Sequence, residues 1–236
     1  MRNGLLGLPI HLGGTDAARN TKHTMKQIPI TSQAITSKEF RMAVEANPGW
    51  ASMLTQPVEI TDFCDMTGSL ITHLSPLLHF TGRDEDGTCA RFWECKSLKV
   101  AEGTFHGCVL FCNSGIEKIG ELNVTQPQDN GDAAWFYSCA SLKVAEGTFP
   151  GFVEFGGSGV EKIGNLVITR PNTKGEAASF ACCFSLKVAE GTYPGTVDFR
   201  YAALERSEDF HIILPSGEEI VTEYTGCQKI EALTLW

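Results

Sequence analysis

The chain has 236 residues, of which 42% are hydrophobic and 14 are phenylalanine, so it is long enough to bury a sizeable core. Its formal net charge of −9 disfavours nucleic acid and anionic membrane surfaces as partners, because both attract a positive balance of charge. No stretch approaches the ~20 apolar residues of a transmembrane helix, so we expect neither a nucleic-acid binder nor a membrane protein.

Residues 1–36 have no clear periodicity, and we predict that they form a flexible or extended N-terminal arm. The apolar run at the start of this arm is broken by Gly4, Gly7, Pro9 and His11, which argues against a secretory signal peptide. The expected location is therefore cytoplasmic. The alternative is a protein secreted without a classical signal peptide, with this arm as its export segment.

Residues 37–68 are predicted to form an N-terminal capping helix and a first strand. The segment SKEFRMAVEANPGWASML offers Ser37 as the N-cap, apolar side chains such as Phe40 and Val44, and a stop near Asn47-Pro48-Gly49.

Residues 69–212 contain an internal repeat with a period of 44 residues. The sequence SLKVAEGTF begins at Ser97 and at Ser141, and returns as SLKVAEGTY at Ser185. Each unit divides into a short coil of 19 residues and a long coil of 25 residues, and every coil starts at a phenylalanine: Phe92, Phe111, Phe136, Phe155, Phe180 and Phe199. The polar sequences TQPQDNGD at 125–132 and TRPNTKGE at 169–176 hold the extra length, and we expect them to lie together on one flank.

Three columns of residues keep their character when the coils are aligned on these phenylalanines. Three positions later every residue is small: Cys95, Ser114, Cys139, Ser158, Cys183 and Ala202. Eight positions later five are β-branched and apolar: Val100, Ile119, Val144, Ile163 and Val188. Thirteen positions later all are large: Phe105, Val124, Phe149, Ile168, Tyr193 and Ile212. Stacked coils convert such columns into ladders, so we predict that they line the interior.

The segments FWECKSLKV, FYSCASLKV and FACCFSLKV, followed by second halves such as SGIEKIGEL, resemble the BspA-like class of bacterial leucine-rich-repeat proteins. The chain departs from the common pattern in alternating two coil lengths and in having fewer leucines. The resemblance implies a short, curved solenoid of about six to eight coils with a strand-lined face, of class α+β because of the preceding helix. Residues 213–236, where the pattern fades, are predicted to form a C-terminal cap.

Two further sets of residues are candidates for binding. Seven positions after each phenylalanine lies a basic residue, including Lys99, Lys143 and Lys187, opposite a second column that is mostly acidic. This charged stripe can be a recognition surface or only a ladder in which acids offset the repulsion between lysines, and the structural interpretation is favoured. The aromatic residues Trp93, Tyr137 and Tyr201 lie at variable positions that are expected to be exposed, where they could anchor a partner.

No H-E-x-x-H, G-x-S-x-G or P-loop pattern is present, so we assign no catalytic residue. The nine cysteines follow the repeat, which favours reduced and mostly buried thiols. The best metal candidate, Cys89, Cys95, Cys108 and Cys112, fits zinc spacing only loosely, and the turn Asp84–Asp86 only partly fits a calcium loop, so no metal or cofactor is expected. We therefore expect a non-enzymatic protein-binding or scaffold module whose partner is another protein. The alternatives are a secreted effector or surface adhesin and an enzyme with a site in the C-terminal region.

Overall fold

The computed structural model describes residues 34–187 and 191–203, and outside these ranges only the backbone of five short strands. These strands are β1 (Gly7–Pro9), β2 (Gln27–Pro29), β18 (Phe210–Ile213), β19 (Glu219–Val221) and β20 (Lys229–Ile230). The rest of the predicted arm and of the predicted C-terminal cap lies outside the described residues.

The described part consists mostly of parallel strands in three larger sheets, with one α-helix. The eight-stranded sheet contains β20 and the strands β5 (Cys64–Asp65), β7 (Thr88–Arg91), β9 (Cys108–Leu110), β11 (Asp132–Trp135), β13 (Phe152–Glu154), β15 (Glu176–Ser179) and β17 (Thr196–Asp198). One five-stranded sheet contains β3 (Ala34–Ile35), β4 (Val58–Ile60), β6 (Leu78–Phe80), β8 (Val100–Phe105) and β10 (Lys118–Val124). The other contains β12 (Val144–Phe149), β14 (Lys162–Ile168), β16 (Gly191–Tyr193), β18 and β19.

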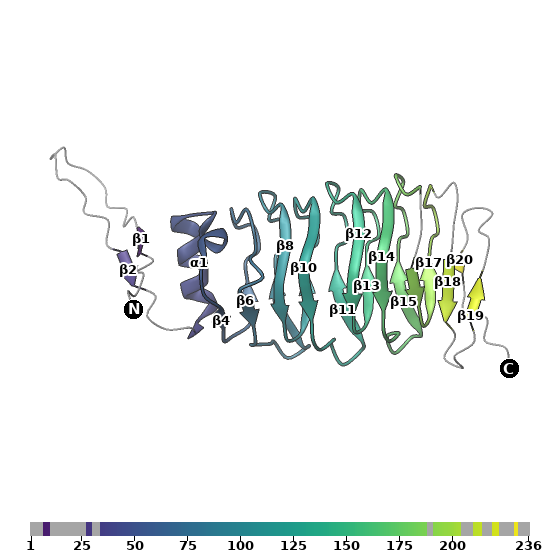
Figure 1. Cartoon of the computed structure of the whole chain (residues 1–236), viewed down its shortest axis with the longest axis horizontal. Coiled ribbons are helices and arrows are strands. Elements are labelled where there is room, and N and C mark those ends of the chain that lie inside the picture. The colour runs from purple at the N-terminus through teal and green to yellow at the C-terminus, as the bar shows by residue number, and fades with distance from the viewer. Residues whose placement is uncertain are drawn as a thin grey trace.

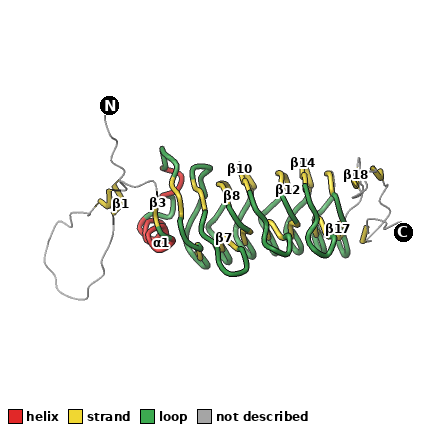
Figure 2. Tube along the Cα trace, turned by 90° about the horizontal axis from the view of Figure 1, so that it is seen from below, coloured by secondary structure: helices red, strands yellow, loops and turns green. Residues whose placement is uncertain are grey.

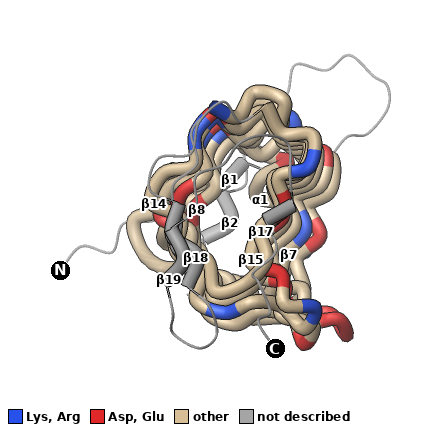
Figure 3. The backbone as a smooth tube through the Cα atoms, turned by 90° about the vertical axis from the view of Figure 1, so that its right-hand side faces the viewer, with Lys and Arg blue, Asp and Glu red and all other residues tan. Residues whose placement is uncertain are grey.

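Successive strands stack along the long axis of the molecule, with α1 (Ser37–Ala46) near one end (Figure 1). The chain alternates between the eight-stranded sheet and a five-stranded sheet, which gives the zigzag course of Figure 2. Viewed along the axis, the turns of backbone overlie one another around a common interior, with strands on two sides (Figure 3). The sequence led us to expect one strand-lined face, whereas the structure has two. The pairings are parallel except for β1–β2, β17–β20 and β18–β19.

Helix α1 begins one residue earlier than predicted, because Thr36 rather than Ser37 is the N-cap. Its hydroxyl accepts a hydrogen bond from the Glu39 amide (3.2 Å), and the Glu39 carboxylate accepts one from the Thr36 amide (2.8 Å), which completes a capping box. The helix ends before Asn47, as predicted, and a 3₁₀ turn follows (Trp50–Met53). Buried Phe40 packs edge-on against Phe80 (5.9 Å between ring centroids), so α1 covers the end of the core. Just before it, Ala34 and Ile35 pair with β4, so ordered structure begins inside the segment expected to be an arm.

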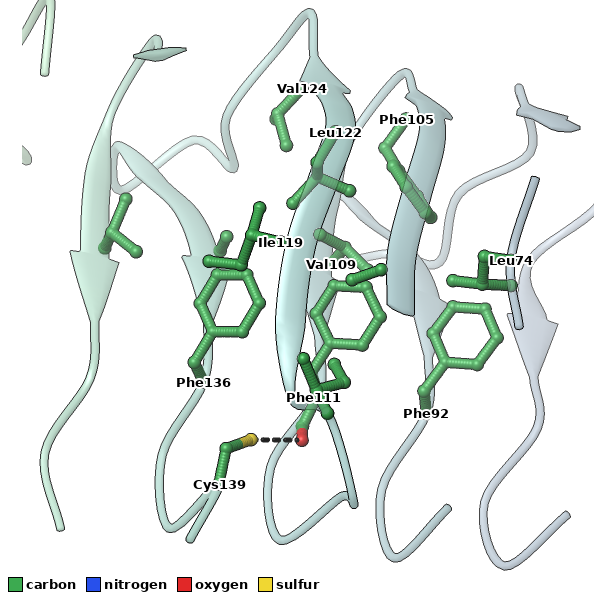
Figure 4. Close-up of a cluster of buried hydrophobic side chains, with 14 of the residues drawn as sticks. Leu74, Phe92, Phe105, Val109, Phe111, Ile119, Leu122, Val124, Phe136 and Cys139 are labelled. Atoms are coloured by element: carbon green, nitrogen blue, oxygen red, sulfur yellow. Dashed lines mark hydrogen bonds between the residues drawn. The ribbon is translucent and has the colours of Figure 1, made fainter. Parts of the chain in front are cut away.

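The phenylalanines that begin the coils form a continuous buried stack, as predicted. All six are completely buried, and neighbouring rings lie 5.0–5.5 Å apart in stacked geometry from Phe92 to Phe199. The column of large residues thirteen positions later is also buried as far as side chains are described. Figure 4 shows Phe92, Phe111 and Phe136 aligned along the interior beside residues of the facing strands.

The small column is buried, and its cysteines form specific hydrogen bonds. The Cys139 thiol donates to the Phe111 carbonyl at 3.1 Å (Figure 4) and lies 3.4 Å from the Ser114 hydroxyl of the preceding coil. Cys183 repeats both contacts 44 residues later with Phe155 and Ser158, at 3.2 and 3.5 Å. The alternation of cysteine and serine in this column therefore links each short coil to the long coil before it.

The prediction that the column eight positions after each phenylalanine lines the interior is confirmed for the long coils and wrong for the short coils, while Val188 lies outside the described residues. Ile119 and Ile163 are buried, but Val100 is half-buried and Val144 is exposed. The strand register gives the reason: Ile119 pairs with Ala101, and Val100 pairs with Lys118. The turn of a short coil contains one extra residue, because buried Leu98 lies six positions after its phenylalanine and buried Ile116 only five.

A β-bulge removes this one-residue shift before the strand ends. The register slips between Ile119 and Leu122 of β10, where the long coil carries the extra residue, and Val124 then pairs with Phe105. The next unit repeats the same arrangement in β12 and β14. The columns three and thirteen positions after each phenylalanine therefore align, while those at seven and eight do not.

The two polar loops lie together on one flank, as predicted. The Thr173 amide donates to the Asn130 carbonyl at 2.8 Å, which joins the loop at 169–176 to the loop at 125–132. The Gln128 side chain donates to the Thr88 hydroxyl at 2.8 Å and extends the row to the turn before β7. In that turn the Asp84 carboxylate accepts hydrogen bonds from the Asp86 and Thr88 amides, which is ordinary turn chemistry.

Candidate binding surface

The outer face of the eight-stranded sheet carries the most varied side chains of the repeat. Each phenylalanine points inward, so the residue that ends the strand before it and the turn residue after it lie toward the outside, although Leu110 and Ser179 are still buried. The residues before it are aligned by the strand register: Arg91, Leu110, Trp135, Glu154, Ser179 and Asp198. The residues after it are Trp93, Cys112, Tyr137, Gly156, Ala181 and Arg200. These two columns form the candidate surface, which we call the outer face.

Apart from Arg91, the N-terminal half of the outer face is mostly apolar and aromatic. Trp93 is 41% exposed and Tyr137 is 53% exposed, in the same column. The Arg91 guanidinium lies 5.0 Å from the Trp93 ring and 3.5 Å from the Asp65 carboxylate, so the indole is held by a cation–π contact. Burial raises the pKa of the neighbouring Cys112 thiol to about 11, although a hydrogen bond from Trp93 opposes the shift. This half therefore presents two exposed aromatic rings, of which Trp93 is held by Arg91, and a thiol that burial disfavours from ionising.

The C-terminal half of the outer face contains a hollow of about 320 Å³. Tyr137 and Phe152 line it together with three carboxylates from consecutive strands, Glu154 of β13, Glu176 of β15 and Asp198 of β17. The only basic side chain in its lining is Arg200. We call this feature the acidic hollow.

Each carboxylate of the acidic hollow is fixed by a neighbour. Glu154 accepts a hydrogen bond from the Gly156 amide (2.6 Å), and Glu176 accepts one from Asn172 (3.1 Å). Arg200 donates to both oxygens of Asp198, the shortest contact being 2.6 Å. Burial is the main cause that raises the pKa of Glu154, and the nearby charges of Asp198 and Glu176 add to it. The hollow therefore concentrates negative charge that Arg200 offsets only in part.

Tyr201 belongs to a different column from Trp93 and Tyr137. It is 69% exposed, but it follows its phenylalanine by two positions, and its φ of 60° lies in the left-handed region. The equivalent residues of the other coils share this backbone conformation: Glu94, Asn113, Ser138, Gly157 and Cys182. This column varies in sequence because its side chains face solvent, yet its backbone is uniform throughout the repeat.

The lysine column predicted from the sequence does not form, because of the extra residue in each short-coil turn. Lys99 aligns with Glu117, and their side chains form an ion pair at 2.6 Å. Lys143 and Glu161 repeat this pair at 2.7 Å, and the Lys187 amide donates to the Glu161 carbonyl. The hydrogen bond from Lys143 lowers the pKa of Glu161, and the charge of Lys187 also lowers it. Basic and acidic side chains therefore alternate from coil to coil along this row. No separate acidic column is needed to offset repulsion between lysines.

The lysines and the aromatic residues lie on different sides of a turn. Trp93 and Tyr137 follow β7 and β11 of the eight-stranded sheet, whereas Lys99 and Lys143 directly precede β8 and β12 of the five-stranded sheets. The structure therefore separates the two candidate sets rather than joining them on one strand face.

Two of the cysteines considered as metal ligands form hydrogen bonds with different parts of the backbone. Cys95 donates to the Met66 carbonyl at 3.0 Å in the small column, while Cys89 lies close to the carbonyls of residues 107 and 108. Burial raises the pKa of both thiols, and that of Cys89 reaches about 12. Within residues 34–187 and 191–203 no three His, Cys, Asp or Glu side chains are grouped to hold a metal ion. The eight cysteines described there are free thiols, and six of them are buried.

Sequence reasoning missed the acidic hollow and the exposed ring of Phe184, which is 72% exposed in the turn after β15. The sequence does contain a pattern that indicates the carboxylates of the hollow. Glu154 and Asp198 directly precede Phe155 and Phe199, so extending the column comparison to the residues before each phenylalanine places both acids on one face.

Comparisons with known proteins return no similarity to this chain: no family model, no curated protein and no solved structure matches it. In the portion of the chain that the structure describes, the helices are too short and too polar to span a bilayer.

Proposed function

We propose that the chain is a solenoid of leucine-rich-repeat type, similar to the BspA-like class, that acts as a non-enzymatic protein-binding module. The stacked parallel strands and the repeating contacts every 44 residues support this reading of the fold. The free thiols of the described part suit a reducing compartment, which favours the cytoplasm over secretion.

The observation that carries the proposal is the outer face, where Trp93 and Tyr137 remain exposed just after strands β7 and β11, and where Tyr137 lines the hollow. Binding energy between proteins concentrates in a few aromatic or arginine side chains that fill pockets. The charged ladder is a weaker candidate, because Lys99 and Lys143 already have acidic partners within the chain and exposed ion pairs contribute little.

The test uses the full chain to capture a partner from the lysate of its native host, followed by titration calorimetry with the purified partner. Tyr137→Ala should weaken binding by about 2 kcal/mol or more if the ring is an anchor. Lys143→Ala serves as the control, and it should change the dissociation constant less than about threefold. A silent Tyr137→Ala together with loss of binding in Lys143→Ala would assign recognition to the charged ladder and overturn the proposal, as would failure to retain any partner.

A further inference from the structure

The acidic hollow has the size and lining of a site for one side chain of a partner. Its volume of about 320 Å³ lies at the lower end of the ~300–1,000 Å³ range of ligand pockets. Phe152 and Ala181 supply apolar surface in its lining, and three carboxylates supply acceptors. Such a lining matches a side chain with an aliphatic stem and a charged end better than a purely apolar or a purely polar group.

The charge of the hollow selects a cation. Glu154, Glu176 and Asp198 carry three negative charges on neighbouring strands, and Arg200 pairs with Asp198 alone among them. Burial and the neighbouring charges of Asp198 and Glu176 raise the pKa of Glu154, and a bound cation would act in the opposite direction. An anionic group would instead meet a net negative charge that Arg200 offsets only in part.

The geometry favours an organic cation over a metal ion. The carboxylates are fixed by the Gly156 amide, by Asn172 and by Arg200, and in the described ranges they do not converge into a group able to ligate a metal. Tyr137 adds an aromatic ring to the lining, and such rings attract ammonium and guanidinium groups. Hydrogen-bond acceptors spread over three strands suit the several donors of a lysine or arginine head group.

We propose that the acidic hollow receives a lysine or arginine side chain from the protein partner that binds the outer face. The inference rests on the proposed function, and it specifies the chemistry of the partner: a basic segment whose cationic side chain enters the hollow while neighbouring residues contact Tyr137 and Trp93. The charge complementarity of Glu154, Glu176 and Asp198 is the basis of this assignment.

The experiment measures binding of a fluorescein-labelled peptide with three lysines spaced by Gly-Ser, and of the same peptide with glutamates, by anisotropy at physiological salt. The full chain should bind the lysine peptide and not the glutamate peptide. The double variant Glu154→Gln/Glu176→Gln should raise the dissociation constant of the lysine peptide roughly tenfold. The charge-matched control Glu117→Gln/Glu121→Gln, on and next to β10 of a five-stranded sheet, should change it less than about twofold.

A second variant keeps the carboxylates and blocks the hollow. Ala181→Arg introduces a cation into the lining, and it should abolish binding of the lysine peptide while circular dichroism remains that of the wild type. Equal weakening by both double variants would show that only the net charge attracts the peptide, and no binding to the wild type would show that the hollow takes no basic side chain. Either result overturns this inference. If Tyr137→Ala loses the captured partner but Glu154→Gln/Glu176→Gln retains it, the proposed protein-binding function stands and only the assignment of a basic side chain to the acidic hollow is overturned.

Discussion

At the scale of single residues, glycines mark the places where neighbouring coils approach most closely. A Cβ atom on Gly115 or Gly159 would lie 2.0 Å from the carbonyl oxygen of Lys96 or Ala140 in the preceding short coil. The amides of these glycines donate to the same coil, with Gly159 bound to the Cys139 carbonyl at 3.1 Å. Backbone atoms cannot move aside as a flexible side chain can, so these two positions require glycine.

We predict that Gly159→Ala lowers the free energy of unfolding by about 1–3 kcal/mol, because the added methyl group forces the two coils apart. Gly164→Ala is the matched control, since its Cβ would meet nothing closer than 3.8 Å and its φ is not in the left-handed region. That variant should lie within about 0.5 kcal/mol of the wild type. Urea denaturation measures both, and equal stabilities for the two variants would contradict the close contact at Gly159.

A second residue-scale prediction concerns Glu154, whose pKa burial raises above the ordinary value of 4.5. The carboxyl group of Glu154 therefore binds its proton more tightly in the folded chain than in the unfolded chain. The protonated group stabilises the folded state fully at pH values below the ordinary pKa, and this stabilisation is lost as the pH rises through the raised pKa of the folded state. Glu154→Gln should consequently be more stable than the wild type at pH 7, and the difference should vanish below about pH 4. Urea denaturation at both pH values tests this, and a variant less stable than the wild type at pH 7 would contradict it.

At the scale of elements, the extra residue in each short-coil turn and the bulge in each long coil act as a pair. Lys99 thereby meets Glu117, and Lys143 meets Glu161, instead of another lysine. We predict that a double-mutant cycle of Lys143→Ala and Glu161→Ala gives a small coupling energy that declines further at about 1 M salt, because both side chains are exposed. A control cycle of Lys162→Ala and Glu161→Ala should give no coupling, because Lys162 is exposed and forms no ion pair with Glu161. A large coupling that persists in salt would show that the ladder holds the strands together.

The same pair of irregularities explains which elements the sequence could predict. Counting positions from Phe92 and Phe111 correctly places the phenylalanine stack and the small column in the interior. Both sets of residues come before the extra residue in the short-coil turn, so the coils are still in register there. It also places Phe105 and Val124 correctly, because the bulge has restored the register by then. Between these points the sequence shows only that Val100 and Ile119 are alike, and a one-residue slip sends them to opposite faces. The hollow could be predicted only in part, since its shape depends on side chains from three strands that are distant in the sequence.

At the scale of the whole molecule, the contacts between units repeat after 44 residues. Phe136 and Phe180 both begin short coils, and each stacks on the phenylalanine of the preceding long coil at 5.2 and 5.0 Å. Cys139 and Cys183 form the same thiol contacts with that long coil. A unit can therefore be removed so that the new junction reproduces an existing one, provided that a short coil still follows a long coil.

We predict that deletion of residues 136–179 leaves a folded and monodisperse protein with lower stability, because neighbouring units interact mainly with each other in a one-dimensional stack. Phe180 and Cys183 would then take the places of Phe136 and Cys139 against Phe111. Deletion of residues 136–154 is the matched control, since it removes one short coil and sets two long coils side by side, where the turn residue and the bulge no longer compensate. Size-exclusion chromatography, circular dichroism and urea denaturation distinguish the outcomes. An insoluble 136–179 deletion would show that a 44-residue unit cannot be removed from the stack. A 136–154 deletion of equal stability would show that the order of short and long coils does not matter. Either result would contradict the prediction that the pair of coils is the repeating structural unit.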